Sequence, residues 1–253
     1  MKKILILICI ALVFGCASES TSPTGNQSDS RSSTGSSTGT GGSLARFTIA
    51  KNHLYIATES ELFTYSLATS SKPQFLNKIR ITEGVETIFS LGDFLYIGTQ
   101  GGMIIYDITQ ASAPSFASNY WHVTSCDPVV ANEDHAFVTL RSGTACQRGD
   151  NRLDIIDIEN KRSPSLVRSI SLEQPIGLGL HNDFLYVCDN SKIKRFDISS
   201  ALFPVEEESI ALPGVFDIII NNNILIAVHP EGVTQYAIGE NGTLGILSTI
   251  TKD

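Results

Sequence analysis

An apolar pattern recurs five times along this chain, and its spacing constrains the fold more than any other feature of the sequence. Each unit holds a first apolar run such as FLYIGT, a second such as MIIYDI, and then a turn. A fixed period near 40 residues is typical of a repeat architecture. The central residues of the first runs are spaced 41, 41, 49 and 40 residues apart, and they are Tyr55, Tyr96, Phe137, Tyr186 and Ile226.

Each unit divides into four short strands, because one apolar segment precedes the first run and another follows the turn. The segments are rich in β-branched and aromatic residues and are separated by Gly, Asn, Asp and Pro, as in antiparallel hairpins. Four strands in about 40 residues are typical of a β-propeller blade, and the doubly apolar middle runs suit packing between two neighbouring blades. The sequence therefore predicts an all-β fold, a single five-bladed β-propeller of four-stranded antiparallel blades.

The predicted propeller starts near Leu44, and every unit begins with its innermost strand. No terminal strand is left over to complete another blade, so we expect no strand exchange. We expect packing between the first and fifth blades to close the ring; the alternatives are closure by a partner chain and a sixth unit. The five units occupy about residues 44–84, 85–125, 126–174, 175–214 and 215–253.

The repeat resembles the LVIVD-repeat family of bacterial secreted propellers. The resemblance lies most clearly in MIIYDITQASAPSF from Met103 and LDIIDIENKRSPSLV from Leu153, and it extends over residues 44–251. It implies the propeller fold and carries no shared activity.

The first 16 residues have the pattern of an export signal. Two lysines precede an apolar run over residues 4–14, which is shorter than the roughly 20 residues that span a bilayer as a helix. The run ends in Gly15-Cys16 and resembles a bacterial lipoprotein signal, although Val13 and Phe14 depart from the usual pattern. The resemblance implies cleavage after residue 15 and acylation of Cys16, including palmitate, which would anchor the chain to a lipid bilayer. The alternative is an ordinary signal followed by a chance cysteine.

The anchor would be followed by a tether. Residues 16–43 are rich in Ser, Thr and Gly and hold almost no large apolar side chain, which is typical of a flexible linker. By the same resemblance, Ala17 and Ser18 lack the aspartate that retains lipoproteins at the inner membrane. We therefore expect an exported, lipid-anchored protein of the outer membrane, facing the periplasm or the cell surface.

The charge of the chain argues against nucleic acid as a partner. The formal net charge is −8, and removal of Lys2 and Lys3 with the signal makes it about −10. A chain this acidic repels the phosphate backbone.

The third unit is longer than the others and is the first candidate for a binding site. Its extra residues lie between the second and third strands, on what we call the mouth face, where the loops before the first strands also lie. Arginines and aromatic residues are common at protein interfaces; an insertion without function is the alternative. The candidate partner-binding residues are Tyr120, Trp121, Arg141, Arg148, Asp150 and Arg152.

Carboxylates near the central channel form a second candidate group. Glu86, Asp127 and Asp217 lie at or beside the start of an innermost strand, where they could hold a cation or simply form a solvated acidic channel. His122 and His229 also reach the mouth face, but two imidazoles are weak evidence for zinc. We assign no cofactor and no metal.

Other polar residues of the repeats are interpreted as structural. His53, His135 and His181 fall in the turns between first and second strands and are expected to be turn or surface residues. Three aspartates precede the proline turns, where a carboxylate commonly accepts backbone N–H groups; they are Asp107, Asp157 and Asp197.

The cysteines of the exported chain predict one disulfide. Cys126 opens the innermost strand of the third unit and Cys146 lies in its long mouth-face loop, so we expect these two to be bonded. Cys188 aligns with Gly98 inside a second strand and is expected to be a buried thiol. The competing pair is Cys146 with Cys188.

Two functions from different classes follow from these features. The preferred one is a non-catalytic binding module for an unknown protein or glycan partner, because no catalytic motif such as GxSxG occurs. The alternative is a propeller enzyme, metal-dependent and lactonase-like or lyase-like, acting at the channel mouth.

Overall fold

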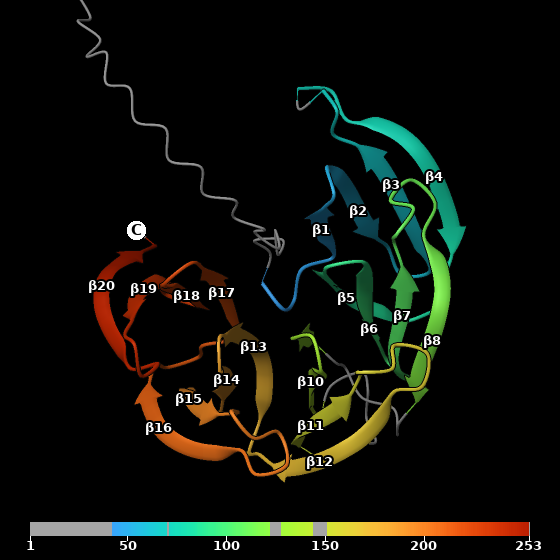
Figure 1. Ribbon diagram of the computed structural model, residues 1–253. Coiled ribbons are helices and arrows are strands. Elements are labelled where there is room, and N and C mark those ends of the chain that lie inside the picture. Colours follow the sequence, from blue (N-terminus) through green and yellow to red (C-terminus); the bar gives the residue numbers. More distant parts are fainter. Residues whose placement is uncertain (1–41, 70, 122–127, 144–150, 253) are drawn as a thin grey trace, which may run out of the picture. The chain divides into compact units, whose positions relative to one another are not determined.

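The computed structural model describes residues 42–69, 71–121, 128–143 and 151–252, all within one compact unit. These residues form twenty strands and no helix, so this part of the chain has no helix that could cross a membrane (Figure 1). The strands make five sheets of four, and within each sheet the strands follow one another in chain order. The predicted all-β fold with five four-stranded antiparallel blades is therefore confirmed.

Each blade runs from an innermost to an outermost strand. The first consists of β1 (Phe47–Ala50), β2 (His53–Ala57), β3 (Glu61–Ser66) and β4 (Gln74–Arg80). The second consists of β5 (Val85–Leu91), β6 (Phe94–Thr99), β7 (Gly102–Asp107) and β8 (Ser115–Trp121). The third consists of β9 (Val129–Ala131), β10 (His135–Leu140), β11 (Arg152–Asp157) and β12 (Ser165–Ser171). The fourth consists of β13 (Pro175–His181), β14 (Phe184–Asp189), β15 (Lys192–Asp197) and β16 (Val205–Ala211). The fifth consists of β17 (Asp217–Asn221), β18 (Ile224–His229), β19 (Gly232–Ile238) and β20 (Leu244–Thr251).

Successive blades pack face to face, and the core lies between them. The innermost strands contact in chain order, β1 with β5, β5 with β9, β9 with β13 and β13 with β17. In the middle blades the second strands are buried on both faces, as the sequence predicts; β6, β10 and β14 are each buried at five of six positions. Cys188 lies in β14, fully buried and free, in the core between the fourth and fifth blades.

Side-chain hydroxyl groups form hydrogen bonds between some neighbouring blades. Tyr55 in the first blade donates to the carbonyl of Ala111 in the second at 2.7 Å, and Tyr186 in the fourth donates to that of Gly242 in the fifth at 2.6 Å. The equivalent hydroxyl of Tyr96 is buried and has no hydrogen-bond partner among the described residues. Between the second and third blades, the Ser118 hydroxyl instead donates to the carbonyl of Lys161 at 2.5 Å, in the corresponding turn.

This difference between two equivalent tyrosines predicts opposite responses to loss of the hydroxyl. We expect Tyr186→Phe to lower the free energy of unfolding by about 1–2 kcal/mol, because a buried carbonyl loses its donor. Tyr96→Phe should be neutral or stabilising, since it removes a buried hydroxyl that lacks a partner. Urea unfolding followed by circular dichroism measures both variants, and a larger loss for Tyr96→Phe would contradict the assignment.

The expected closure between the first and fifth blades is not observed. Among the described residues, no strand of the first blade makes an extensive contact with a strand of the fifth (Figure 1). Burial shows the same result: β2 and β18 alternate between buried and half-buried positions, so each blade is covered on one face only. The covered faces belong to the cores shared with the second and fourth blades.

The uncovered faces, which we call the two open faces, are mostly apolar. Strand register places residues of neighbouring strands side by side on each face. On the first blade the large apolar residues of the open face are Phe47, Ile49, Leu54, Ile56, Phe63 and Tyr65, and the same face carries Glu61 and Lys78. On the fifth blade its large apolar residues are Ile219, Ile224, Ile226, Val228, Val233 and Ile250, and the same face carries Asp217, Asn221 and Gln235. These apolar residues have the composition of a blade interior, yet they are half-buried or exposed.

Candidate functional site

A short segment before β1, residues 42–46, contacts the innermost strands of the second, fourth and fifth blades, and we call it the crossing segment. Ser43 is 3% exposed; its hydroxyl donates to Asp217 Oδ1 at 3.1 Å and accepts the backbone N–H of Leu178 at 2.8 Å. Two residues later, the carbonyl of Ala45 accepts the N–H of Ile88 in the second blade at 2.9 Å. The composition of the sequence assigns Ser43 to the tether, but the structure places it in the propeller, because its hydroxyl satisfies buried polar groups of two blades.

The channel carboxylates hold the crossing segment. Asp217 accepts hydrogen bonds from Ser43 and from the N–H of Ile218, while its burial raises the pKa of the carboxyl. Glu86 pairs with Arg46 at 3.6 Å and accepts from Gln100 Nε2 at 3.2 Å. Two of the three predicted channel acids are therefore engaged by contacts with the protein itself. The third, Asp127, lies outside the described residues.

The histidines proposed for an enzyme do not join these acids. His229 is 7% exposed, and its Nε2 lies 3.0 Å from the hydroxyl of Thr234 in the same blade. His122 lies outside the described residues. Within the described part of the chain, no three His, Cys, Asp or Glu side chains are grouped as metal ligands would be.

The partner-binding candidates of the third unit are only partly described. Trp121 ends β8 and is 56% exposed, next to half-buried Tyr120. Arg152 pairs with buried Asp154 at 2.9 Å. The pKa of Tyr120 is raised, mainly by burial and secondarily by the negative charge of Asp154, so this ion pair lies close to the aromatic side chain. Arg141 is half-buried after β10. The remaining predicted residues lie outside the described part: Cys16, Cys126, Cys146, Arg148 and Asp150.

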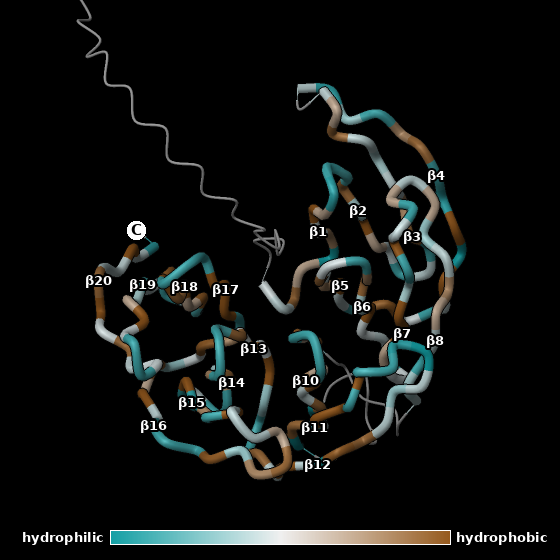
Figure 2. The backbone as a smooth tube through the Cα atoms, in the orientation of Figure 1, coloured by the Kyte–Doolittle hydropathy of each residue, from teal (hydrophilic) through white to brown (hydrophobic). Residues whose placement is uncertain are grey.

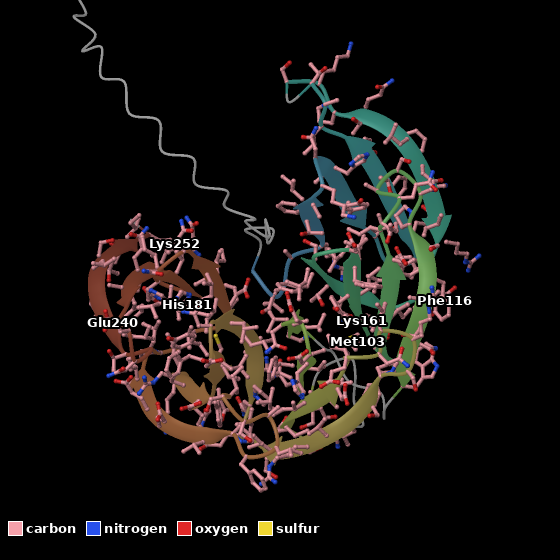
Figure 3. All side chains as sticks on the ribbon, viewed as in Figure 1. Met103, Phe116, Lys161, His181, Glu240 and Lys252 are labelled. Carbon is pink, nitrogen blue, oxygen red and sulfur yellow. The ribbon has the colours of Figure 1, made fainter. Side chains whose placement is uncertain are left out.

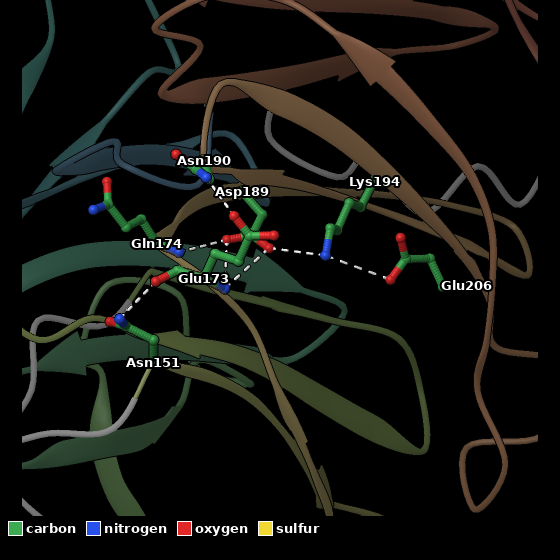
Figure 4. Close-up of polar contacts among 7 residues, drawn as sticks. All are labelled: Asn151, Glu173, Gln174, Asp189, Asn190, Lys194 and Glu206. Carbon is green, nitrogen blue, oxygen red and sulfur yellow. Dashed lines mark hydrogen bonds and ion pairs between the residues drawn. The ribbon is translucent and has the colours of Figure 1, made fainter.

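Next to this group, a buried carboxylate organises the mouth face of the fourth blade (Figure 4). Asp189, at the end of β14, is fully buried and accepts the backbone N–H groups of Glu173 at 3.0 Å and Gln174 at 2.6 Å. Lys194 lies 3.0 Å from its Oδ2 and 3.5 Å from Glu206. Burial by itself would lower the pKa of Lys194, but these two carboxylates raise it.

The structure contains a cavity that the sequence analysis did not anticipate. It has a volume of about 430 Å³ and lies among the innermost strands of the second to fifth blades. Its apolar wall consists of Phe89, Leu91, Val130, Leu180, Ile218 and Ile220. Its polar rim, in or beside the turns between first and second strands, consists of Asn132, Glu133, His181, Asn182 and Asn222.

The cavity lies directly beyond the crossing segment and extends to the opposite face. Ile88, Leu178 and Asp217 contact the crossing segment, and the residue that follows each of them lines the cavity. The rim turns are hydrophilic (Figure 2), and His181 ends β13 there (Figure 3). Burial lowers the pKa of His181. The sequence placed this histidine in a turn but not beside a cavity.

An asparagine recurs in the turns between first and second strands, in the first blade away from the cavity as well as in the fourth and fifth at its rim. Asn52, Asn182 and Asn222 have φ values of 59°, 51° and 51°, a left-handed conformation that asparagine tolerates better than most residues. Turn geometry therefore explains the asparagines without a ligand. Only the ring arrangement brings three of the turns between first and second strands around one cavity.

The aspartates before the proline turns have the structural role predicted for them. Asp107, Asp157 and Asp197 each accept the backbone N–H of the residue two positions later, at 2.7, 2.9 and 2.8 Å. Hydrogen bonds from Thr109 lower the pKa of Asp107. Of the other turn histidines, His53 Nδ1 lies 2.7 Å from the carbonyl of Lys51, and His135 begins β10.

The fold defines the protein class: five four-stranded blades in sequence make a β-propeller, with a crossing segment at one end of its channel and a cavity beyond it. The chain carries LVIVD repeats, which match residues 85–121 and 147–171, within the second and third units. The resemblance seen in the sequence is confirmed for these two units. No curated protein matches the sequence.

Solved structures share this fold at low sequence identity. A protein from Lactobacillus plantarum matches with a TM-score of 0.66 and 12% identity, over 79% of this chain and 68% of that one. A periplasmic gluconolactonase from Pseudomonas aeruginosa has a TM-score of 0.61, 13% identity, and coverage of 79% and 67%. A functionally unknown protein from Desulfotomaculum acetoxidans matches with a TM-score of 0.64 and 12% identity, over 82% of this chain and 69% of that one. Identities this low show similarity of fold alone.

Proposed function

We propose that this protein is an exported, lipid-anchored binding module whose propeller binds a protein partner on the two open faces. The observation that carries the proposal is the apolar composition of these faces. Phe47 and Ile49 are 53% and 48% exposed on an innermost strand, and Ile250 is 64% exposed on the outermost strand of the fifth blade. Contiguous exposed apolar surface of this kind marks interaction sites in soluble proteins.

The chemistry of the open faces favours protein over glycan as the partner. Most residues of these faces are aliphatic or aromatic. The polar side chains among them are few, and on the first blade Glu61 and Lys78 already pair with each other at 2.9 Å. Glycan recognition needs many hydrogen bonds, whereas a protein β-sheet with an apolar face reproduces the packing that the middle blades already show. The partner is therefore a β-rich protein that presents apolar side chains.

The matched solved structures suggest the size of the partner surface. About a third of each of the three chains lies beyond the match, whereas the match covers most of this propeller. In this proposal the five blades correspond to one part of a longer ring. A partner that fills the remaining arc would contribute the width of roughly two blades, by the 40-residue period of such repeats.

Export and anchoring rest on residues 1–41, with their lysines, apolar run, Gly15-Cys16 and a composition typical of flexible linkers. In this proposal the tether holds the propeller at the membrane surface, where a partner can reach both open faces. Labelling of cells with a radioactive fatty acid checks the anchor, and a Cys16→Ala variant should lose the label.

Photo-crosslinking in intact cells tests the partner site. We expect benzoyl-phenylalanine at Phe47 to give one defined adduct with another protein, and the same group at Phe203 to give none. Phe203 is a matched control, because it is 69% exposed but lies in the turn before β16, away from both open faces. Ile226→Lys should abolish the adduct, since it places a charge on the opposite open face. Equal adducts at both positions, or none at Phe47, would overturn the proposal.

A second experiment distinguishes partner binding from direct packing of the first blade against the fifth, which would also cover the two open faces. Cysteines at Ile49 and Ile219, on the innermost strands of the two open faces, should stay unbonded in the purified protein under oxidising conditions. A disulfide requires the two Cα atoms to lie within about 7 Å. Rapid intramolecular bonding of this pair would show that the first and fifth blades cover one another, and the partner site would then be excluded.

A further inference from the structure

The central cavity has the size and polarity of a small-molecule site. Its volume of about 430 Å³ falls in the range of ligand pockets, which combine apolar walls with a few polar groups. Three of its wall residues, Phe89, Leu180 and Ile220, are half-buried rather than fully packed. An apolar body can therefore remove their remaining surface from water.

One end of the cavity is bounded by a fixed part of the structure. Ser43 of the crossing segment is buried and bonded to two blades, and Arg46 pairs with Glu86. A ligand would thus enter from the opposite face, past the rim turns. Its polar end would lie at the rim while its apolar end points toward the crossing segment.

The charged residues that line the cavity indicate which ligand charge it would favour. At pH 7 Glu133 carries the single formal charge among the described lining residues, because burial lowers the pKa of His181 and keeps its imidazole neutral. The described lining contains no lysine or arginine, and the whole chain has a net charge of −8. The Lys161 ammonium lies outside the lining and donates to the backbone carbonyl of Glu133 at 2.5 Å, which leaves the carboxylate free for a ligand. An anionic ligand would meet repulsion at the rim, and a cation would be attracted there.

We infer that the cavity binds a small organic cation, an amine attached to an apolar ring. The ring packs against the wall residues Phe89, Leu180 and Ile220, and the ammonium group lies at the rim near the Glu133 carboxylate. The amide oxygen atoms of Asn182 and Asn222 are the available neutral acceptors, because that of Asn132 already accepts the N–H groups of Asp134 and His135. This site is independent of the proposed partner surface, because none of the residues of the two open faces lines the cavity.

Calorimetry with three probes of equal shape and different charge tests the inference on the purified protein. The probes are tryptamine, tryptophol and indole-3-acetate, which share an indole ring and carry an ammonium, a hydroxyl and a carboxylate group. We expect tryptamine to bind at least tenfold more tightly than indole-3-acetate, with tryptophol between them. The preference should weaken as salt is added, because Glu133 is exposed.

Two pairs of variants locate the binding. Glu133→Gln should bring the affinities of tryptamine and tryptophol within about threefold, while Glu159→Gln, an exposed glutamate of the same blade outside the lining, should change neither. Leu91→Trp should block all three probes, and Leu202→Trp, at an exposed residue before β16, should not. Circular dichroism confirms that each variant is folded.

Three results would overturn the inference. One is that no probe binds to the unmodified protein. Another is that indole-3-acetate or tryptophol binds as tightly as tryptamine. The last is that Glu159→Gln or Leu202→Trp has the same effect as its partner variant, which would place the binding elsewhere.

Discussion

Replacement of Asp189 by alanine is expected to destabilise the propeller by about 3–5 kcal/mol, as is typical when one partner of a buried ion pair is removed. The carboxylate is fully buried and holds Lys194, whose side chain is 13% exposed, together with two backbone N–H groups (Figure 4). The alanine variant leaves Lys194 with Glu206 alone, 3.5 Å away. Urea unfolding followed by circular dichroism measures the loss.

Two controls separate the buried pair from other effects of the substitution. Asp197→Ala removes a surface aspartate of the same blade that bonds to the N–H of Ser199, and it should cost about 1 kcal/mol. The double variant Asp189→Ala with Lys194→Met should be less destabilised than the sum of the single variants, because the residues interact. A loss below about 1 kcal/mol for Asp189→Ala would contradict the assigned role.

The same ion pair predicts a dependence on pH. The pKa of Lys194 is raised in the folded protein, so its contribution is fully present below the unfolded pKa and is lost as the pH rises through the folded value. The stability difference between the unmodified protein and Lys194→Met should therefore shrink at strongly alkaline pH.

Alanine at Gly102 is expected to cost at least about 3 kcal/mol, since it combines an unfavourable backbone conformation with a collision. Gly102 begins β7 with a φ of 148°, and a Cβ atom there would lie 2.0 Å from the carbonyl oxygen of Tyr120 on the neighbouring strand. The equivalent glycine of the fifth blade, Gly232, has a φ of 145° and would place its Cβ 1.9 Å from the carbonyl of Ile250. At both positions, pairing with the outermost strand leaves no room for a side chain, so glycine is required.

The neighbouring glycine provides the control for this prediction. A Cβ at Gly101 would lie 3.3 Å from the ring of exposed Trp121, which can move. We therefore expect Gly101→Ala to change the free energy of unfolding by less than about 1 kcal/mol. Thermal unfolding of both variants decides the point, and equal losses would show that general loss of loop flexibility, and not the Gly102 conformation, is responsible.

Several elements are predictable from sequence because they depend on local pattern. The short apolar runs around Tyr96 and Tyr186 and their spacing define strands and their number per unit, since each blade repeats the same hydrogen-bonded hairpins. The turn role of Asp107 is predictable for the same reason, because its acceptor and donor are two residues apart. The burial of Cys188 follows from its alignment with Gly98 in the repeat.

The candidate site is less accessible to sequence reasoning. Glu86 and Asp217 lie at or beside the start of an innermost strand, but their contacts depend on Arg46 and Ser43, which precede the first strand. The bond between Ser43 and Asp217 joins residues 174 positions apart. The repeat pattern does not predict this contact, because the hydrogen bond joins the segment before the first blade to the last blade.

Five all-β units, their strands and their apolar middle runs can be derived from the sequence, because these properties arise within about 40 residues. How the units curve around the channel, and therefore which faces are covered, depends on the folded arrangement of all five. Ile56 and Ile97 follow the central tyrosines of two equivalent runs, yet Ile97 is fully buried between blades and Ile56 is half-buried on an open face. The hydrophobic effect favours contact with any apolar neighbour, because it is not directional. The sequence pattern therefore indicates that each blade face is buried by another surface, but it does not specify whether this chain or another protein supplies that surface.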